Sequence, residues 1–274
     1  MIEGTTRLVG LIGDPVSHSR SPRMHNAAFA ALDLDLAYVP LRVAAHDLAP
    51  ALRGLAALGF IGANVTIPHK EGVARGCDDL TPAARAAGSV NTVTVRHDSS
   101  LLGDSTDGAA VVAALAAVGH APRRGVRARV LGAGGSARAV AAALVAAGAA
   151  VEIEARRPQA AAALVAALGG GDARITVAAG WAAPDVLVNC TPLGGASALQ
   201  ESPVPADLLG DVPVVCDLAY RPDARPTVLC AEAARLGCGV VDGLEVLVRQ
   251  GALAFESWLG RQAPLDVMRA AARA

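Results

Sequence analysis

One lysine stands out among the side chains of this chain that could do chemistry. Lys70 is the only lysine in 274 residues, although lysine and arginine together number 24. Arginine stays protonated at any physiological pH, whereas a partly desolvated lysine can release and regain a proton. Position 70 therefore suggests a titratable ammonium group. A GC-rich gene would also deplete lysine, so the residue type alone leaves a chance survivor open.

A carboxylate and several side-chain amides lie close to the predicted ends of strands. Asp107 follows one such strand. Three of the four asparagines lie at or beside others, namely Asn64, Asn91 and Asn189. In an open α/β sheet, ligands bind outside the carboxyl ends of the strands. A lysine and a carboxylate that face a substrate alcohol could transfer its proton while a hydride moves. The spacing of Lys70 and Asp107 does not show whether they meet.

Serine hydroxyls gather in the segment Ser17–Pro22, just before a predicted helix. Hydroxyls and backbone N–H groups at a helix start could hold a substrate carboxylate. Ser21 precedes Pro22, which is also the pattern of an ordinary N-cap followed by proline in the first turn. The local pattern favours the N-cap, and the carboxylate site is the alternative.

A glycine-rich turn follows an apolar strand and precedes an alanine-rich helix. Gly132, Gly134 and Ala137 fit the spacing GxGxxA, and Gly135 and Ser136 lie between them. The first glycine permits a tight turn, the second lets the backbone approach a pyrophosphate, and the small alanine allows close helix packing. The helix N-terminus then faces the phosphates. The sequence predicts a dinucleotide-binding loop, with a ligand-free glycine turn as the alternative.

Two features at the end of the next predicted strand bear on the choice of cofactor. Glu154 lies 20 residues after Gly134, the spacing of a carboxylate that binds the ribose hydroxyls of NAD. Arg156 and Arg157 follow, and an arginine there can bind a 2′-phosphate through charge-assisted hydrogen bonds. We favour NADP, because NAD would leave two consecutive cations without a use. Two solvated arginines are the alternative.

The elements that must position these residues alternate between strand and helix, which predicts the α/β class with mainly parallel sheets. In the first part we expect strands at 8–12, 38–42 and 64–66, an antiparallel pair at 90–96 and 101–103, and helices from 21 and near 46. From Asp107 onward we expect helices at 107–118, 136–148 and 158–168, and strands at 129–131, 151–155, 185–189, 214–217 and 239–242. This second run predicts a doubly wound, Rossmann-like domain.

Two domains are expected from this alternation. Residues 1–107 with 243–274 should form a substrate-binding and catalytic domain, and residues 108–242 an NADP-binding Rossmann domain. The linker should lie near residues 103–108, and the return connection near residues 242–243.

Short motifs run in order along the whole chain. They are Gly13–Pro22, Asn64–Glu71, Ser89–Thr92, Thr106–Gly108, the glycine loop, Asp217–Tyr220, and Asp242–Leu244 with Gln250. Together they resemble the shikimate dehydrogenase family. The resemblance implies NADPH-dependent reduction of 3-dehydroshikimate to shikimate, a step in the chorismate route to aromatic amino acids.

The resemblance also implies roles for individual residues. Lys70 and Asp107 would be the catalytic pair. The substrate would contact Ser19 and Ser21 through its carboxylate, and Thr66, Asn91, Tyr220 and Gln250 elsewhere. The cofactor NADP(H) would contact Gly132, Gly134, Gly135, Ser136, Ala137, Arg156, Arg157, Asn189, Thr191 and Gly243, with Arg156 at the 2′-phosphate.

Some positions depart from the family pattern. The family often has asparagine where Ser105 stands, Asn-Arg-Thr where this chain has Ala155–Arg157, and a second arginine where Ala160 stands. His69 is often another residue; we expect it beside the site or on the surface, with the surface favoured. One alternative is therefore an NAD-preferring quinate/shikimate dehydrogenase, which Glu154 supports. The other is a non-catalytic sensor of shikimate-like acids.

Composition bounds the partners and the compartment. A net charge of -1 gives no electrostatic footprint for nucleic acid or an anionic membrane. The longest uncharged apolar stretch, residues 139–151, is too short to span a bilayer, and the first residues do not resemble a signal peptide. The five cysteines contain no CxxC pair, so neither a metal site nor a disulfide framework is expected. We expect a cytoplasmic monomer or homodimer that binds small molecules.

Overall fold

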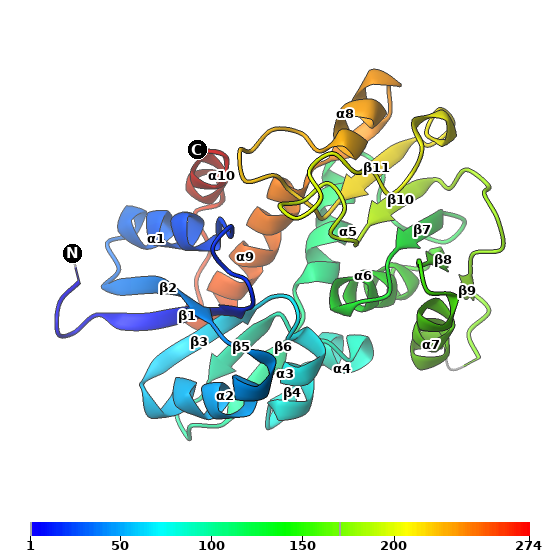
Figure 1. Cartoon of the computed structure of the whole chain (residues 1–274). Helices are drawn as coiled ribbons and strands as arrows, with labels where there is room; N and C mark the ends of the chain where they lie inside the picture. The colour runs from blue at the N-terminus through cyan, green and yellow to red at the C-terminus, as the bar shows by residue number, and fades with distance from the viewer. Residues whose placement is uncertain (1, 170) are drawn as a thin grey trace. The chain divides into compact units, whose positions relative to one another are not determined.

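The computed structural model describes residues 2–169 and 171–274 and divides the chain into two compact units (Figure 1). One unit ends at Thr106 and resumes from Val248 to Ala274. The other comprises Asp107–Leu247. Helix α9 (Gly243–Leu259) begins in the second unit and carries the chain back into the first. The domain boundaries expected from the sequence were at residues 107 and 243.

The first unit is built on a six-stranded mixed sheet. Its strands are β1 (Arg7–Gly13), β2 (Leu36–Arg42), β3 (Phe60–Val65), β4 (Asp79–Leu80), β5 (Thr92–Val95) and β6 (Leu101–Asp104). They lie in the order β2-β1-β3-β5-β6-β4. Strand β1 is parallel to β2 and β3, and β4 is parallel to β6, whereas β5 is antiparallel to both β3 and β6.

Helices pack against this sheet and bury its central strand. They are α1 (Ser21–Ala31), α2 (Leu48–Ala57), α3 (Lys70–Gly76), α4 (Pro82–Ala87), the end of α9 and α10 (Leu265–Arg273), with the 3-10 turn η1 (Ala45–Asp47). Helices α1 and α10 lie side by side (Figure 1). Every residue of β3 is buried, as expected for a strand that is covered on both faces.

Trp258 attaches the end of α9 to the sheet. Its Nε1 donates to the backbone oxygen of Val93 at 2.9 Å. Gly62 on β3 makes this approach possible, because a Cβ there would collide with that oxygen and with the indole. A glycine inside a strand often marks such a close contact. The contact holds the helix that carries Gln250 against the middle of the sheet.

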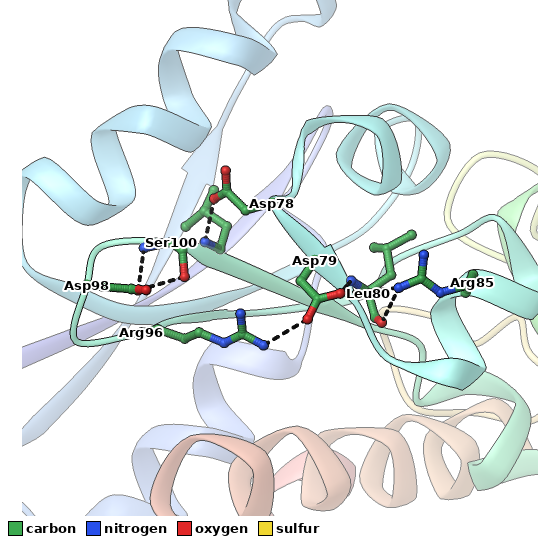
Figure 2. Close-up of polar contacts among 8 residues, drawn as sticks. Asp78, Asp79, Leu80, Arg85, Arg96, Asp98 and Ser100 are labelled. Atoms are coloured by element: carbon green, nitrogen blue, oxygen red, sulfur yellow. Dashed lines mark hydrogen bonds and ion pairs between the residues drawn. The ribbon is translucent and has the colours of Figure 1, made fainter.

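Polar contacts hold the short strand β4 at the edge of this sheet (Figure 2). Asp79 accepts hydrogen bonds from the guanidinium groups of Arg85 and Arg96, and Asp78 accepts one from the backbone N–H of Leu101 at 2.7 Å. The exposed ion pairs contribute little stability by themselves. Their charges also discourage an edge strand from pairing with another chain.

His25 is a fully buried imidazole among aromatic rings of the first unit. It stacks on Tyr38 with ring centroids 4.5 Å apart and an interplanar angle of 6°, and Trp258 lies 5.5 Å away. Neither ring nitrogen has a hydrogen-bond partner within residues 2–169 and 171–274. Burial lowers the pKa of His25 from its ordinary 6.5 to about 3. The imidazole is therefore neutral in the folded protein.

Acid is expected to destabilise the protein through His25. The unfolded chain takes up this proton near pH 6.5 and the folded chain only near 3, so stability is lost as the pH falls through that window. At about pH 5 the free energy of unfolding should be lower by about 2 kcal/mol. Urea unfolding at about pH 7.5 and about pH 5 should show this loss as the difference between the parent and His25→Phe.

A second buried group opposes this effect and requires the paired comparison. In the other unit, burial raises the pKa of Asp217 to about 6, so its protonation adds stability as the pH falls. When the change in unfolding free energy of His25→Phe is subtracted from that of the parent, this contribution cancels, because both proteins retain Asp217. An equally steep acid loss in both proteins would contradict the role of His25.

The second unit is built on a six-stranded parallel sheet. Its strands are β7 (Arg127–Leu131), β8 (Ala150–Glu154), β9 (Ile175–Val177), β10 (Val186–Asn189), β11 (Val214–Asp217) and β12 (Gly239–Val241). They lie in the order β12-β11-β10-β7-β8-β9, which is the strand order of the doubly wound Rossmann fold. The strand order reverses between β7 and β10, where such folds bind dinucleotides.

Helices cover both faces of this parallel sheet. They are α5 (Asp107–Ala117), α6 (Gly135–Ala146), α7 (Pro158–Gly169), α8 (Val228–Arg235) and the start of α9, with the 3-10 turn η2 (Ala206–Leu208). Side chains that alternate along the strands form a separate apolar core on each face. Gly108 brings α5 close to α6, because a Cβ there would collide with the backbone oxygen of Ala139.

The structure confirms the predicted α/β class and the doubly wound arrangement of the second run of elements. The antiparallel pair of the first sheet is also confirmed as β5 and β6. Strand β3 begins earlier than predicted, and the short elements α3, α4, β4 and β9 and helix α8 were not predicted. Among the described residues, no helix combines the length and apolar character needed to cross a bilayer.

Candidate functional site

The last residue of β1 packs against the residue that follows β3. A Cβ on Gly13 would collide with the Cγ2 atom of Thr66, so only glycine allows this approach. The chain then turns, with the N–H of Ser19 donating to the oxygen of Val16 at 3.1 Å. The N–H of Ser21 donates to the hydroxyl of Ser19 at 3.2 Å. Ser19, Ser21 and Thr66 therefore belong to neighbouring turns of the first unit.

The N-cap interpretation of Ser21 is wrong. Helix α1 begins at Ser21 itself, Arg20 occupies the N-cap position, and no side chain there caps the helix. The N–H of Ser21 donates to the hydroxyl of Ser19, and the helix begins at Ser21, one residue earlier than the N-cap interpretation predicts. The hydroxyl of Ser21 is thus not used as a helix cap, although its residue is buried.

Buried amides connect the ends of β3 and β5. The hydroxyl of Tyr38 donates to Oδ1 of Asn64 at 2.8 Å. The Nδ2 group of Asn64 donates to the backbone oxygen of Asn91 at 3.1 Å and to the hydroxyl of Thr92 at 3.2 Å. Because buried amides need partners on both atoms, these bonds fix the orientation of Asn64. They also fix the backbone at Asn91.

Asn91, Thr106 and Gln250 form a second buried network. The Nδ2 group of Asn91 donates to the hydroxyl of Thr106 at 2.9 Å and to Oε1 of Gln250 at 3.1 Å. Oδ1 of Asn91 accepts from the N–H of Thr106 at 2.8 Å. Two of the predicted substrate residues, Asn91 and Gln250, are therefore in direct contact. Thr106 joins them and was not predicted as a site residue.

Lys70 is the first residue of α3, at the end of the turn that follows β3. Its backbone oxygen accepts from the N–H of Val90 at 3.0 Å. The N–H of Val65 donates to the oxygen of Asn91 at 2.8 Å. These backbone bonds hold Lys70 next to the segment that carries Asn91, whatever its side chain does.

The expectation that His69 lies on the surface is wrong. Its side chain is 2% exposed, and Nε2 lies 2.7 Å from the backbone oxygen of Val43. The turn between β3 and α3 explains this, because the N–H of His69 donates to the oxygen of Thr66 and turns the ring inward. His69 is thus buried directly beside Lys70 in the chain and satisfies a carbonyl after β2.

Asp107 begins α5 and belongs to the second unit. It is 6% exposed. An acidic residue in the first turn of a helix is favourable, because it faces the positive end of the helix dipole. The next residue, Gly108, packs against α6, so the start of α5 cannot shift freely. The carboxylate is therefore held at a defined place in this unit.

The glycine loop connects β7 to α6 as predicted. Gly132 has a φ of +113°, which favours glycine, and a Cβ there would lie 3.2 Å from the backbone oxygen of Cys190. Gly134 is the N-cap of α6, its side-chain position is open, and no side chain caps the helix. Ala137 is fully buried against the sheet. The open, uncapped helix start fits the phosphates of a dinucleotide.

Gly135 and Ser136 are the first two residues of α6. Helix N–H groups in the first turn have no partner within the helix, which makes them donors for an anion. The structure therefore brings the five predicted loop residues together at one helix end. Within the described part of the chain, no group of histidine, cysteine or acidic side chains could hold a metal ion.

A buried carboxylate, Asp217, organises the loops that follow β10 and β11. It accepts from Nδ2 of Asn189 at 2.8 Å and from the hydroxyl of Thr227 at 2.6 Å. Oδ1 of Asn189 in turn accepts from the N–H and the hydroxyl of Thr191, at 2.9 and 2.7 Å. Burial raises the pKa of Asp217 to about 6, although these donors lower it. Asn189 and Thr191 are thus in direct contact.

Two further predicted residues lie around the loop that follows β11. The N–H of Ala219 donates to Asp217 at 2.9 Å, which fixes the backbone next to Tyr220. A Cβ on Gly243 would collide with the backbone oxygen of Ala219. Gly243 therefore lies against this loop at the start of α9. Tyr220 is partly exposed.

Charged side chains lie at the end of β8 and just after it, next to the glycine loop. The N–H of Gly132 donates to the backbone oxygen of Glu154 at 2.7 Å, so this strand end adjoins the loop. Arg156 and Arg157 are exposed, and their guanidinium groups have no partner among the described residues. The carboxylate of Glu154, by contrast, lies 3.3 Å from Nη1 of Arg129. Arg129 was not predicted as part of any site.

The missed residues had weak signals in the sequence. Asp217 directly follows three apolar strand residues, and in its motif only Tyr220 was assigned a role. Arg129 interrupts an apolar strand, and Glu152 and Glu154 alternate along the next one. Only the strand register, which pairs Arg129 with Glu152, brings these charges together.

Known families match both ends of the chain. The model described as "Shikimate dehydrogenase substrate binding domain" matches residues 11–93. The model described as "Shikimate 5'-dehydrogenase C-terminal domain" matches residues 243–273. Both descriptions agree with the family that the motifs resemble.

Similarity to individual proteins extends over nearly the whole chain. A protein of Rubrobacter xylanophilus called shikimate dehydrogenase (NADP(+)) is 47% identical, over 98% of this chain and 96% of its own. The shikimate 5-dehydrogenase of Thermus thermophilus, solved with NADP(H) and shikimate, is 36% identical with a TM-score of 0.87, over 98% and 99% of the two chains. A 5-ketofructose reductase of Gluconobacter sp. strain CHM43 is 33% identical with a TM-score of 0.84, over 98% and 99%. The chain therefore belongs to the shikimate dehydrogenase family.

Proposed function

We propose that this protein is an NADP-dependent oxidoreductase that reversibly reduces 3-dehydroshikimate to shikimate, in the chorismate route to aromatic amino acids. The observation that carries this proposal is the 47% identity, over 98% of the chain, to a relative named for that activity. The arrangement of polar groups in each unit agrees with it. The activity requires a cofactor loop, a site for a polyhydroxylated acid, and a group that donates a proton.

The substrate site is proposed to lie on the first unit. Ser19 and Ser21, at the start of α1, would bind the substrate carboxylate with hydroxyl and backbone donors. Thr66, Asn91 and Gln250 would contact the ring hydroxyls, and Tyr220 is a further proposed substrate contact. The buried network of Asn91 supports this role, because its side chain and that of Gln250 are held in one orientation before substrate binds.

Lys70 and Asp107 are proposed to handle the proton. NADPH, when bound, supplies the hydride that reaches the carbonyl carbon of the substrate. The ammonium of Lys70 gives a proton to the oxygen on that carbon as negative charge develops there. The carboxylate of Asp107 orients the ammonium and the resulting hydroxyl. In the reverse direction, Lys70 takes the proton back.

The second unit is proposed to bind NADP(H). Gly132, Gly134, Gly135, Ser136 and Ala137 would receive the pyrophosphate at the open start of α6. Asn189, Thr191 and Gly243 would line the cofactor crevice. Arg156 and Arg157 would bind the 2′-phosphate, a role supported by their exposed and unpaired guanidinium groups in the described chain.

Replacing Arg156 with alanine should raise the Michaelis constant for NADPH about 10- to 100-fold, the range of one or two lost charge-assisted hydrogen bonds. The Michaelis constant for NADH should change little, because NADH has no 2′-phosphate. Steady-state kinetics with both cofactors at saturating 3-dehydroshikimate would measure both values.

Arg124→Ala is a matched control for this experiment. Arg124 is an exposed arginine of the same unit, in the connection between α5 and β7. Its loss should leave both Michaelis constants unchanged. An equal rise for NADPH and NADH in Arg156→Ala would argue against recognition of the phosphate.

The domain roles, partners and compartment complete the proposal. Residues 1–107 with 243–274 would bind the substrate, and residues 108–242 the cofactor. The partners would be these small molecules, without nucleic acid or membrane, and the protein would act in the cytoplasm as a monomer or homodimer. The net charge of -1 supports the absence of a nucleic-acid partner.

One second candidate function is favoured by a specific residue. Glu154 stands where a carboxylate can bind the ribose hydroxyls of NAD, so an NAD-preferring quinate/shikimate dehydrogenase is the alternative. A non-catalytic sensor of shikimate-like acids has less support, because Lys70 and Asp107 are both present.

A direct assay distinguishes these functions. Purified protein would be mixed with shikimate or quinate and with NADP or NAD in all four pairings, and reduced cofactor would be followed by absorbance. We expect the highest kcat/KM for shikimate with NADP. A preference for NAD with quinate would favour the alternative. The absence of reduced cofactor in all four pairings would favour the sensor. Fructose with NADP should give no NADPH. This control excludes a dehydrogenase that oxidises polyols in general.

A further inference from the structure

A buried arginine lies in the middle of a central strand of the second unit. Arg129 of β7 is 1% exposed and is the largest fully buried side chain among the described residues. Both neighbours of β7, strands β8 and β10, are themselves parallel strands of the sheet. Such a position normally holds an aliphatic residue, because a buried charge is costly unless it is paired. The arginine therefore needs an explanation.

Ion pairs and a carbonyl satisfy this guanidinium. Nη2 of Arg129 donates to Oε2 of Glu152 at 2.6 Å and to the backbone oxygen of Gly180 at 2.6 Å. Nη1 donates to Oε2 of Glu154 at 3.3 Å. The ring of Trp181 lies 4.8 Å from the guanidinium carbon, within reach of a cation–π interaction. Glu152, Gly180 and Trp181 hold the arginine in place, and Glu154 accepts from its Nη1 group.

Glu154 is the member of this cluster that adjoins the cofactor loop. It ends β8, and its backbone oxygen accepts from Gly132, the first glycine of the loop. Arg156 and Arg157 follow it after one residue. The same strand end therefore carries a carboxylate suited to the ribose hydroxyls of NAD and two cations suited to the 2′-phosphate of NADP.

These two recognition modes conflict electrostatically. A 2′-phosphate is doubly charged near neutral pH, and an uncompensated carboxylate a few ångströms away would repel it. A carboxylate that already accepts from an arginine has less charge to repel the phosphate. It also has fewer free lone pairs for a ribose hydroxyl.

We propose that Arg129 is a positioning residue that sets the preference for NADP over NAD by pairing with Glu154 from inside the sheet. This inference rests on the proposed function, since it concerns the same cofactor. Arg129 itself does not touch the cofactor. Its charge compensates the charge of Glu154, and its Nη1 group holds the Glu154 carboxylate toward the sheet. Arg156 and Arg157 then bind the phosphate without repulsion from Glu154.

The test measures cofactor binding as well as activity. Dissociation constants for NADP+ and NAD+, and for adenosine 2′,5′-bisphosphate and AMP, would be obtained by calorimetry for the parent and for Arg129→Met. We expect the ratio of NAD+ to NADP+ dissociation constants to fall roughly 5- to 30-fold, as for one uncompensated charge near the protein surface. Adding Glu154→Gln to Arg129→Met should restore most of the ratio. A purely structural arginine would give no such rescue.

Two single variants keep the test decisive if Arg129→Met folds poorly. Glu154→Gln alone should change the ratio by less than about twofold, because Arg129 already compensates that charge. Glu152→Gln is the matched control. It removes the charge of the other carboxylate that pairs with Arg129, and Glu152, unlike Glu154, is not at the end of β8. This variant should leave the ratio unchanged. A tenfold loss of NAD+ affinity in Glu154→Gln would overturn the inference, because it would mean that Glu154 binds the ribose.

The outcomes separate this inference from the proposed function. If the parent binds NADP+ no better than NAD+, both the NADP assignment and the inference fail. If the parent prefers NADP+ and Arg129→Met keeps that preference, the inference alone fails. A fallen ratio that Glu154→Gln does not rescue would also overturn it, because the effect would not act through Glu154.

Discussion

Replacing Lys70 with alanine is expected to lower turnover about 10²- to 10⁴-fold, the usual contribution of a general acid or base. The same loss is expected for Lys70→Arg, although arginine preserves the charge. A guanidinium does not release its proton at physiological pH, and its planar fork donates in other directions than an ammonium. The comparison therefore separates proton transfer from simple charge stabilisation.

The surrounding structure makes this substitution a clean test. Lys70 is fixed at the start of α3 by its backbone oxygen, which accepts from Val90, and both variants retain that bond. The Michaelis constant for 3-dehydroshikimate should change far less than kcat. The melting temperature of each variant should also stay close to that of the parent.

Arg75→Ala supplies the control on the same helix. Arg75 is exposed in the last turn of α3, on the side of a cavity lined by α2, and should be dispensable for turnover. Turnover of Lys70→Arg within about threefold of the parent would exclude a role in proton transfer. If added small amines restored turnover to Lys70→Ala, this result would support a role of Lys70 in proton transfer.

The second unit was the more predictable half, for a physical reason. Parallel strands covered on both faces consist of continuous apolar runs, and β10 and β11 have that pattern up to their polar ends. The glycine loop is also local, since its conformation depends on residues that are adjacent in the chain. Pattern and local geometry together were enough to predict the fold and the place of the glycine loop.

The first unit contains elements that local patterns cannot reveal. Strand β4 has only two residues, and α3 contains Gly72 and ends at Gly76, which lower helix propensity. Tertiary contacts stabilise both elements. The burial of His69 likewise depends on Val43, a residue far away in the sequence.

Long-range hydrogen bonds also explain what was missed at the candidate site. Thr106 lies in a recognised motif, but its contacts join it to Asn91, 15 residues before it, and to Gln250, 144 residues after it. The pairing of Arg129 with Glu154 depends on the register of two strands. Residue types suggested which groups could do chemistry, and only the fold shows which of them are held together.

Substituting Asp107 with asparagine is the second change with a large expected effect. Asparagine keeps the shape of the side chain and can still accept a hydrogen bond, but it lacks the negative charge that would orient the ammonium of Lys70. We expect turnover to fall about 10²- to 10⁴-fold. Steady-state kcat at saturating 3-dehydroshikimate and NADPH would measure it.

Asp104→Asn provides the control for a carboxylate close by in the chain. Oδ1 of Asp104 accepts from the hydroxyl of Thr81 and from the N–H of Ser105, and the oxygen of an asparagine can accept both bonds. Its turnover should stay within about threefold of the parent. A comparable loss in both variants would mean that Asp107→Asn acts by disturbing the segment rather than the chemistry.

The double variant decides whether the two residues act as one unit. If Asp107 works by orienting Lys70, then Asp107→Asn has little left to remove once the lysine is absent, and Lys70→Ala with Asp107→Asn should be about as slow as the slower single variant. Independent roles would instead multiply the two losses, giving about 10⁴-fold or more.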